Sequence, residues 1–106
     1  MSHRIDQIRA LLNTSPDDVL LHYSLGMELA GAGRTDEAVA EFRRCRQIDE
    51  GYLAAFVEEG KCLRTAGRLD EAREALAAGM ELAAMQGETH TRDFIQQQLD
   101  GLPRPT

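Results

Sequence analysis

The sequence contains no tryptophan, and only 5% of its 106 residues are aromatic. Alanine and leucine supply most of its apolar side chains, which favours helices that pack closely over small residues. It has no apolar run near the roughly 18 residues that a membrane span requires. The opening segment places Arg4, Asp6 and Arg9 within its apolar stretch, so it does not resemble a secretory signal. We therefore expect a cytoplasmic protein with no membrane segment.

Basic residues are also scarce, since 12 lysines and arginines stand against 18 acids and give a net charge of −6. Nucleic-acid binding normally requires a basic patch. The one local cluster of bases, Arg43, Arg44 and Arg46, is flanked by acids on both sides. We interpret this cluster as a solvated helix face and expect no nucleic-acid partner.

The sequence has few groups that could carry chemistry. Its two cysteines, Cys45 and Cys62, lie 17 residues apart, with no histidine at the spacing of a metal site. They are interpreted as small buried apolar residues, so no metal and no cofactor is expected. His3, His22 and His90 fall on three different predicted helices, and no serine or cysteine stands in a nucleophile motif. No catalytic residue is assigned, and the protein is not expected to be an enzyme.

The most informative pattern is a set of eight residues that recurs at a spacing of 34. The set is Gly26, Leu29, Ala32, Gly33, Arg34, Asp36, Glu37 and Ala38, matched by Gly60, Leu63, Ala66, Gly67, Arg68, Asp70, Glu71 and Ala72. A fixed period between about 20 and 50 residues indicates stacked structural repeats. Such units contact only their neighbours and present an extended surface. The repeat therefore favours binding over catalysis.

Apolar residues follow helical spacing almost throughout, and no stretch alternates with a period of two. Six helices are predicted: one capped by Ser2 that ends near Asn13, then about 16–30, 35–48, 52–65, 69–85 and 88–102. Ser15 is the predicted cap of the second helix, with Pro16 at its first position. Residues 1–102 are predicted to form a single all-α domain, and two prolines predict a flexible tail over 103–106.

The sizes of the repeated residues resemble those of the tetratricopeptide repeat family, whose 34-residue unit is a helix–turn–helix. The resemblance rests on small residues at Gly26, Ala38 and Cys45, larger ones at Leu29 and Phe42, and their counterparts Gly60, Ala72, Gly79, Leu63 and Leu76. It implies an α-solenoid of two repeats, about 19–52 and 53–86. A helix would precede the repeats, and a capping helix over about 88–102 would follow them.

Two residues depart from the family pattern, because His22 and Glu59 stand where an apolar side chain is usual. His22 is interpreted as a packed, hydrogen-bonded histidine and not as a catalyst. Glu59 is expected to reach the surface or to pair with a nearby base. The alternative for Glu59 is a buried acid with a raised pKa, which would mark a functional site.

The resemblance also implies a concave groove lined by the first helix of each unit. The candidate groove residues are Leu20, Tyr23, Ser24, Met27, Val57, Glu58, Lys61 and Arg64. Among them, Leu20, Tyr23 and Met27 form an apolar stripe apart from the one that faces the partner helix. Such a stripe is either a binding surface or a face covered by the first helix, and the sequence leaves both open. Lys61 and Arg64 supply positive charge for an acidic group on a peptide.

Some family members clamp the carboxylate of a partner's C-terminus with lysine and asparagine side chains. The matching positions here hold Tyr23, Met27 and Glu58, so that clamp is not expected. Two functions remain open. The first is an adaptor or scaffold whose groove binds a peptide or a segment of another protein. The second is a self-associating structural module, a homodimer formed through the apolar groove or a terminal helix.

Overall fold

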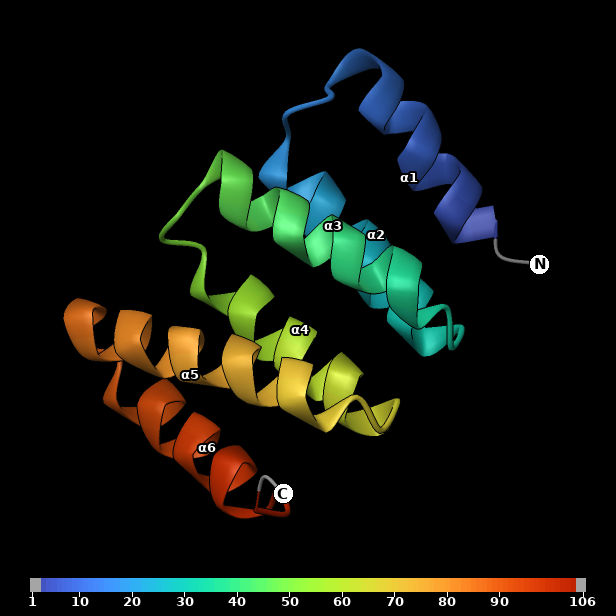
Figure 1. Ribbon diagram of the computed structural model, residues 1–106. Helices are drawn as coiled ribbons and strands as arrows, with labels where there is room; N and C mark the ends of the chain where they lie inside the picture. Colours follow the sequence, from blue (N-terminus) through green and yellow to red (C-terminus); the bar gives the residue numbers. More distant parts are fainter. Residues whose placement is uncertain (1–2, 105–106) are drawn as a thin grey trace.

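The computed structural model describes residues 3–104, and within them the chain forms six helices. These are α1 (His3–Thr14), α2 (Val19–Gly31), α3 (Thr35–Ile48), α4 (Leu53–Thr65), α5 (Leu69–Gln86) and α6 (Thr89–Asp100). Each helix packs chiefly on the one before it and the one after it, which produces an elongated array (Figure 1). The array measures 41 × 28 × 19 Å. The predicted all-α solenoid is confirmed.

Small residues let the helices of each hairpin approach closely. A Cβ atom at Gly26 would lie only 2.6 Å from the Phe42 ring, and one at Gly60 would lie 2.5 Å from Leu76. Ala38 is completely buried in the first hairpin, as is its counterpart in the second. Because protein interiors are close-packed, no larger side chain fits at these crossings without displacing its neighbours.

Glycine also shapes the two hairpin turns. Gly33 and Gly67 have φ values of 75° and 77°, a region that other residues rarely adopt. This geometry lets the amide of the next residue bond back to the preceding helix: Arg34 N–H donates to the Leu29 carbonyl, and Arg68 N–H to the Leu63 carbonyl, both at 2.9 Å. The recurrence of glycine at this position is therefore explained by the turn.

The helices begin and end within one or two residues of the predicted bounds, except at the start of α2. The prediction that Ser15 caps this helix is wrong. The Ser15 amide instead donates to the Leu11 carbonyl at 3.0 Å and so extends the end of α1. The cap is Asp18, whose carboxylate accepts from the Leu21 N–H at 3.1 Å. The other predicted cap, Ser2, lies outside the described residues.

The core consists of three apolar clusters placed along the array. The first joins α1, α2 and α3 with Ala55 of α4, the second lies between the two hairpins, and the third joins α4, α5 and α6. Ile8, Phe42 and Leu76 are buried one per helix at intervals of 34 residues. At the far end, Ile95 is completely buried against α5, which places α6 over the end of the array.

Glu59 is buried, with only 2% of its surface exposed, so the expectation that it reaches the surface is wrong. The expected pairing with a base is confirmed, because its carboxylate accepts from Arg46 at 2.7 Å and from Arg43 at 3.1 Å. The Arg46 guanidinium also lies 4.4 Å from the centroid of the Phe56 ring. Two arginines of the cluster that was predicted to be a solvated face therefore join α3 to α4.

His22 is held between a loop and a neighbouring helix. Its Nδ1 lies 2.7 Å from the Glu41 carboxylate of α3, and its Nε2 lies 2.7 Å from the Pro16 carbonyl oxygen. Both ring nitrogens thus face oxygen acceptors. The interpretation of His22 as a packed, hydrogen-bonded residue is confirmed.

Candidate functional site: the concave face

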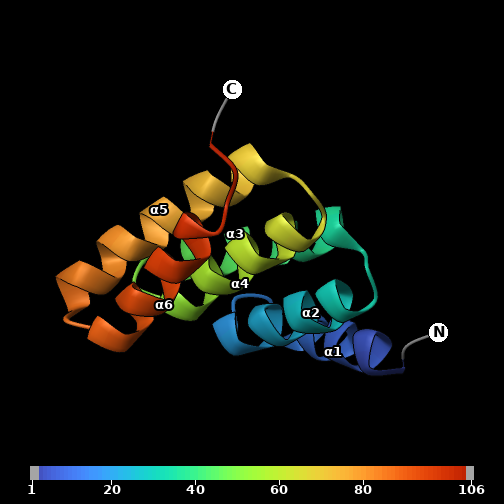
Figure 2. The same ribbon diagram turned by 90° about the horizontal axis from the view of Figure 1, so that it is seen from below.

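The first helices of the two hairpins lie next to each other along one side of the molecule. Together with α6 they line this side, while α3 and α5 lie on the other (Figure 2). Two adjoining hollows open on it, one of about 530 Å³ between α2 and α4 and one of about 370 Å³ between α4 and α6. This surface, lined by α2, α4 and α6, is called the concave face below.

The larger hollow has a mainly apolar lining. Met27 and Ala30 of α2 line one wall, and Lys61 and Cys62 of α4 line the other. Met27 is 40% exposed, and Leu20 is 60% exposed on the same helix. Helix α1 does not cover these two side chains, because it packs through its own isoleucines on the opposite face of α2. The apolar stripe is therefore open at both ends.

Tyr23, in the middle of the stripe, is only partly exposed to solvent. Its ring centroid lies 6.0 Å from that of Phe42 and 5.5 Å from that of Tyr52. Burial raises the pKa of the Tyr23 hydroxyl, and the nearby Glu58 carboxylate raises it further. Tyr23 therefore packs against the first core cluster, and it lines neither hollow.

The smaller hollow involves α6, which sequence reasoning had treated only as a cap. Leu53 and Val57 of α4 line it on one side, and His90 and Phe94 of α6 on the other. Phe94 turns toward α4, whereas its neighbour Ile95 is buried against α5. Adjacent residues on a helix point about 100° apart. The aromatic residue next to Ile95 must therefore face a different neighbour, and this pattern in the sequence could have indicated that α6 lines the concave face.

The charged groups on this face differ from those expected. Glu58 lines both hollows and lies 3.5 Å from the Lys61 ammonium. Lys61 is also 5.9 Å from the centroid of the Phe94 ring. Arg64 lines neither hollow, because its guanidinium donates to the Gln98 side chain at 2.7 Å and joins α4 to α6. Of the three charged candidates, Glu58 and Lys61 therefore line the hollows and Arg64 does not.

The remaining candidate, Ser24, is partly buried on α2 and lines neither hollow. Within residues 3–104, no group of three or more potential ligand side chains is placed to hold a metal ion. Burial and the nearby Glu41 carboxylate raise the pKa of the Cys45 thiol to about 11. Such a thiol stays protonated near neutral pH and is a poor nucleophile. Over the same residues, no helix combines the length and apolar character needed to cross a membrane.

Solved structures with this fold are known. The solution structure of the Bordetella parapertussis protein BPP2914 is 27% identical, covers 94% of this chain and 87% of its own, and gives a TM-score of 0.81. A tetratricopeptide repeat domain protein from Salinibacter ruber gives a TM-score of 0.75 over 86% of this chain and 95% of its own, at 24% identity. The second likeness concerns the fold alone.

Related sequences support the same repeat family. The peroxisomal targeting signal receptor of Candida albicans is 31% identical over 83 residues, although this chain spans only 14% of that protein. The TPR repeat-containing protein PA0015 of Pseudomonas aeruginosa is 32% identical over 84 residues, which cover 79% of this chain and 80% of the relative. The family model of the tetratricopeptide repeat matches residues 29–88. The chain therefore belongs to the tetratricopeptide repeat family.

Proposed function

We propose that this protein is a cytoplasmic adaptor that binds a segment of another protein on its concave face, without catalysing a reaction. The fold itself supports a protein–protein interaction module. The observation that carries the proposal is the pair of adjoining hollows along α2, α4 and α6, the larger of which is lined by the exposed Met27. The relatives named as receptors for a targeting signal are consistent with a polypeptide ligand.

In this proposal, each hollow accepts an apolar side chain of the bound segment. Met27 and Cys62 provide the apolar contacts in the larger hollow, and Val57 and Phe94 provide them in the smaller one. Glu58 lies between the two and contributes a hydrogen-bond acceptor. Buried apolar anchors usually dominate the binding energy, whereas exposed charges mainly affect the rate and orientation of approach.

The test is a calorimetric titration with a partner captured from the cells in which the protein occurs. Met27→Glu places a charge in the larger hollow, and we expect it to weaken binding by about tenfold or more, or about 1.4 kcal/mol. Met85→Glu is the matched control, because Met85 is 80% exposed on α5 and lines neither hollow. Wild-type affinity in the folded Met27→Glu protein would show that the concave face is not the site.

Self-association through the same face is the alternative, and the exposed Leu20 and Met27 favour it equally. Light scattering separates the two functions. A dimer of the 11.8 kDa chain that Met27→Glu dissociates would favour self-association. A wild-type chain that stays monomeric, and whose partner binding Met27→Glu weakens, would favour the adaptor.

A further inference from the structure

Met27 is an exposed sulfur side chain at the proposed binding surface. It is 40% exposed and lines the larger hollow of the concave face together with Lys61 and Cys62. The repeat fold does not require a methionine at this position, because the position 34 residues later holds Lys61 and the one 34 residues after that holds Ile95. The fold therefore leaves the thioether of Met27 available for chemistry at the surface.

The two thiols of the chain are less available to an oxidant. Peroxides attack the thiolate form of cysteine, so a protonated thiol reacts slowly. Cys45 is fully buried, and burial together with the Glu41 carboxylate raises its pKa to about 11. Cys62 lines the larger hollow but is half-buried, and burial raises the pKa of its thiol as well. A thioether has no proton to lose, so the surroundings of Met27 do not suppress its reactivity in this way.

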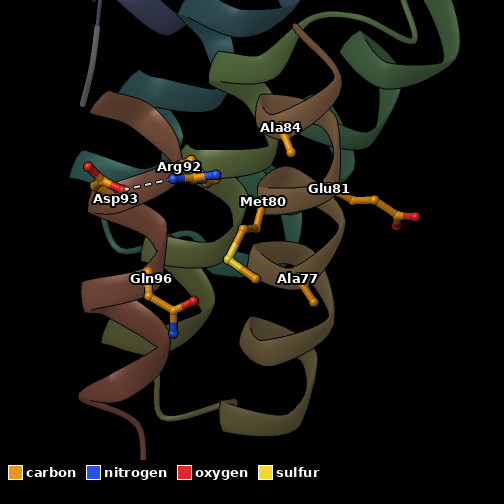
Figure 3. A pocket seen from close by; sticks show the side chains of 7 residues that line it. All are labelled: Ala77, Met80, Glu81, Ala84, Arg92, Asp93 and Gln96. Atoms are coloured by element: carbon orange, nitrogen blue, oxygen red, sulfur yellow. Dashed lines mark ion pairs between the residues drawn. The ribbon is translucent and has the colours of Figure 1, made fainter. Parts of the chain in front are cut away.

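Two further methionines within residues 3–104 provide internal comparisons. Met85 is 80% exposed on α5 and lines neither hollow of the concave face. Met80 is partly buried, and its side chain lies between α5 and α6 in a third hollow of about 580 Å³ (Figure 3). Because an oxidant reaches exposed side chains first, we expect Met27 and Met85 to be oxidised before Met80.

Oxidation of Met27 would make one wall of the larger hollow polar. Hydrogen peroxide transfers one oxygen atom to the thioether: an S=O bond forms as the O–O bond breaks, the sulfur loses two electrons, and the peroxide leaves as water. The sulfoxide accepts hydrogen bonds and therefore holds water where the thioether did not. An apolar side chain that enters the hollow must then displace this water from a polar group, which costs free energy.

We propose that Met27 is a reversible oxidation site, and that its sulfoxide prevents the larger hollow from binding an apolar side chain. A methionine sulfoxide reductase reverses the change with a dithiol: the two thiols become a disulfide, the sulfoxide returns to the thioether, and the oxygen leaves as water. The proposal rests on the proposed function, because it adds control by an oxidant to binding on the concave face.

The first measurement is peptide mapping by mass spectrometry after treatment of the full chain with hydrogen peroxide. Sulfoxide should accumulate at Met27 and Met85 while Met80 remains largely reduced. Circular dichroism should show an unchanged helix content, because neither of the two exposed residues belongs to the buried core. A chain in which Met85 is oxidised and Met27 is not would overturn the proposal.

The second measurement repeats the calorimetric titration of the proposed function, with the same captured partner, on peroxide-treated chains. In Met85→Leu, Met27 is the exposed methionine that is left within residues 3–104. Its oxidised form should bind about tenfold more weakly than its untreated form, and the reductase should restore the affinity. Met27→Leu is the matched control and should bind equally before and after treatment, because leucine keeps the wall apolar without a sulfur.

These results separate the oxidation site from the proposed function. Undiminished binding by oxidised Met85→Leu would overturn the oxidation site, whereas the function stands if Met27→Glu still weakens binding. Wild-type affinity in Met27→Glu would overturn both. An equal loss of affinity in oxidised Met27→Leu and oxidised Met85→Leu would assign the effect to another group, such as Cys62, and would also overturn the proposal.

Discussion

Glu59 shows how a charged residue can occupy a core position of this repeat. Leu25, at the equivalent position of the first repeat, is buried among apolar side chains. The carboxylate that replaces it is tolerated because Arg43 and Arg46 approach it from α3. Removing one partner of a buried pair is costly, because it leaves the other charge without compensation. The pairing therefore holds α3 of the first repeat and α4 of the second in a fixed relative position.

A double-mutant cycle of Glu59→Gln with Arg46→Gln should measure the coupling between these two side chains. We expect a coupling free energy of roughly 1–3 kcal/mol, because both groups belong to one network and the carboxylate is desolvated. Urea unfolding of the four proteins provides the values. The exposed pair of Asp70 and Arg73 on α5 serves as the comparison and should show little coupling. Equal coupling in the two pairs would mean that Glu59 contributes no more than a surface charge.

At the scale of the helices, local patterns predicted most of the structure. Apolar spacing and turn glycines gave the existence and length of all six helices. The start of α2 was the exception, because Ser15 and Asp18 are both good caps, and the sequence does not show that the Ser15 amide is already bonded to Leu11. The orientation of α6 about its own axis could also not be predicted from the sequence. Phe94 and Ile95 are adjacent apolar residues, and only packing decides which of them faces α5.

The role of α6 as a cap can be tested with that pair of neighbours. Ile95 is fully buried with Leu76 and Leu102, whereas Phe94 lines the concave face. Ile95→Ala should destabilise the protein by about 2–5 kcal/mol, because it leaves a cavity under α6. Phe94→Ala should cost much less, since Phe94 remains partly exposed. Thermal melts compare the two, and similar losses for both would show that α6 does not cap α5 through Ile95.

At the scale of the whole molecule, the candidate site could be predicted only in part. The lining of the concave face by α2 and α4 followed from the resemblance to the repeat family. The lining by α6 did not follow from it, because the two repeats end at about residue 86 and Gln98, the partner of Arg64, lies beyond them. Gln98 lies 34 residues after Arg64, so α6 continues the period, but Phe94 stands where the two repeats have Gly26 and Gly60. That is why sequence reasoning assigned Arg64 to the groove and missed His90 and Phe94.

The linear arrangement of contacts predicts how changes at the two ends combine. Ile8 and Ile95 belong to different clusters at opposite ends of the array. Ile8→Val and Ile95→Val should each cost about 0.5–1.5 kcal/mol, and together they should cost the sum to within about 0.5 kcal/mol. Ile5→Val with Ile8→Val is the matched pair within one cluster, and its effects should deviate from additivity. Urea unfolding measures both combinations. Strong coupling between the two ends would mean that strain passes through both repeats, contrary to contacts that join only neighbouring helices.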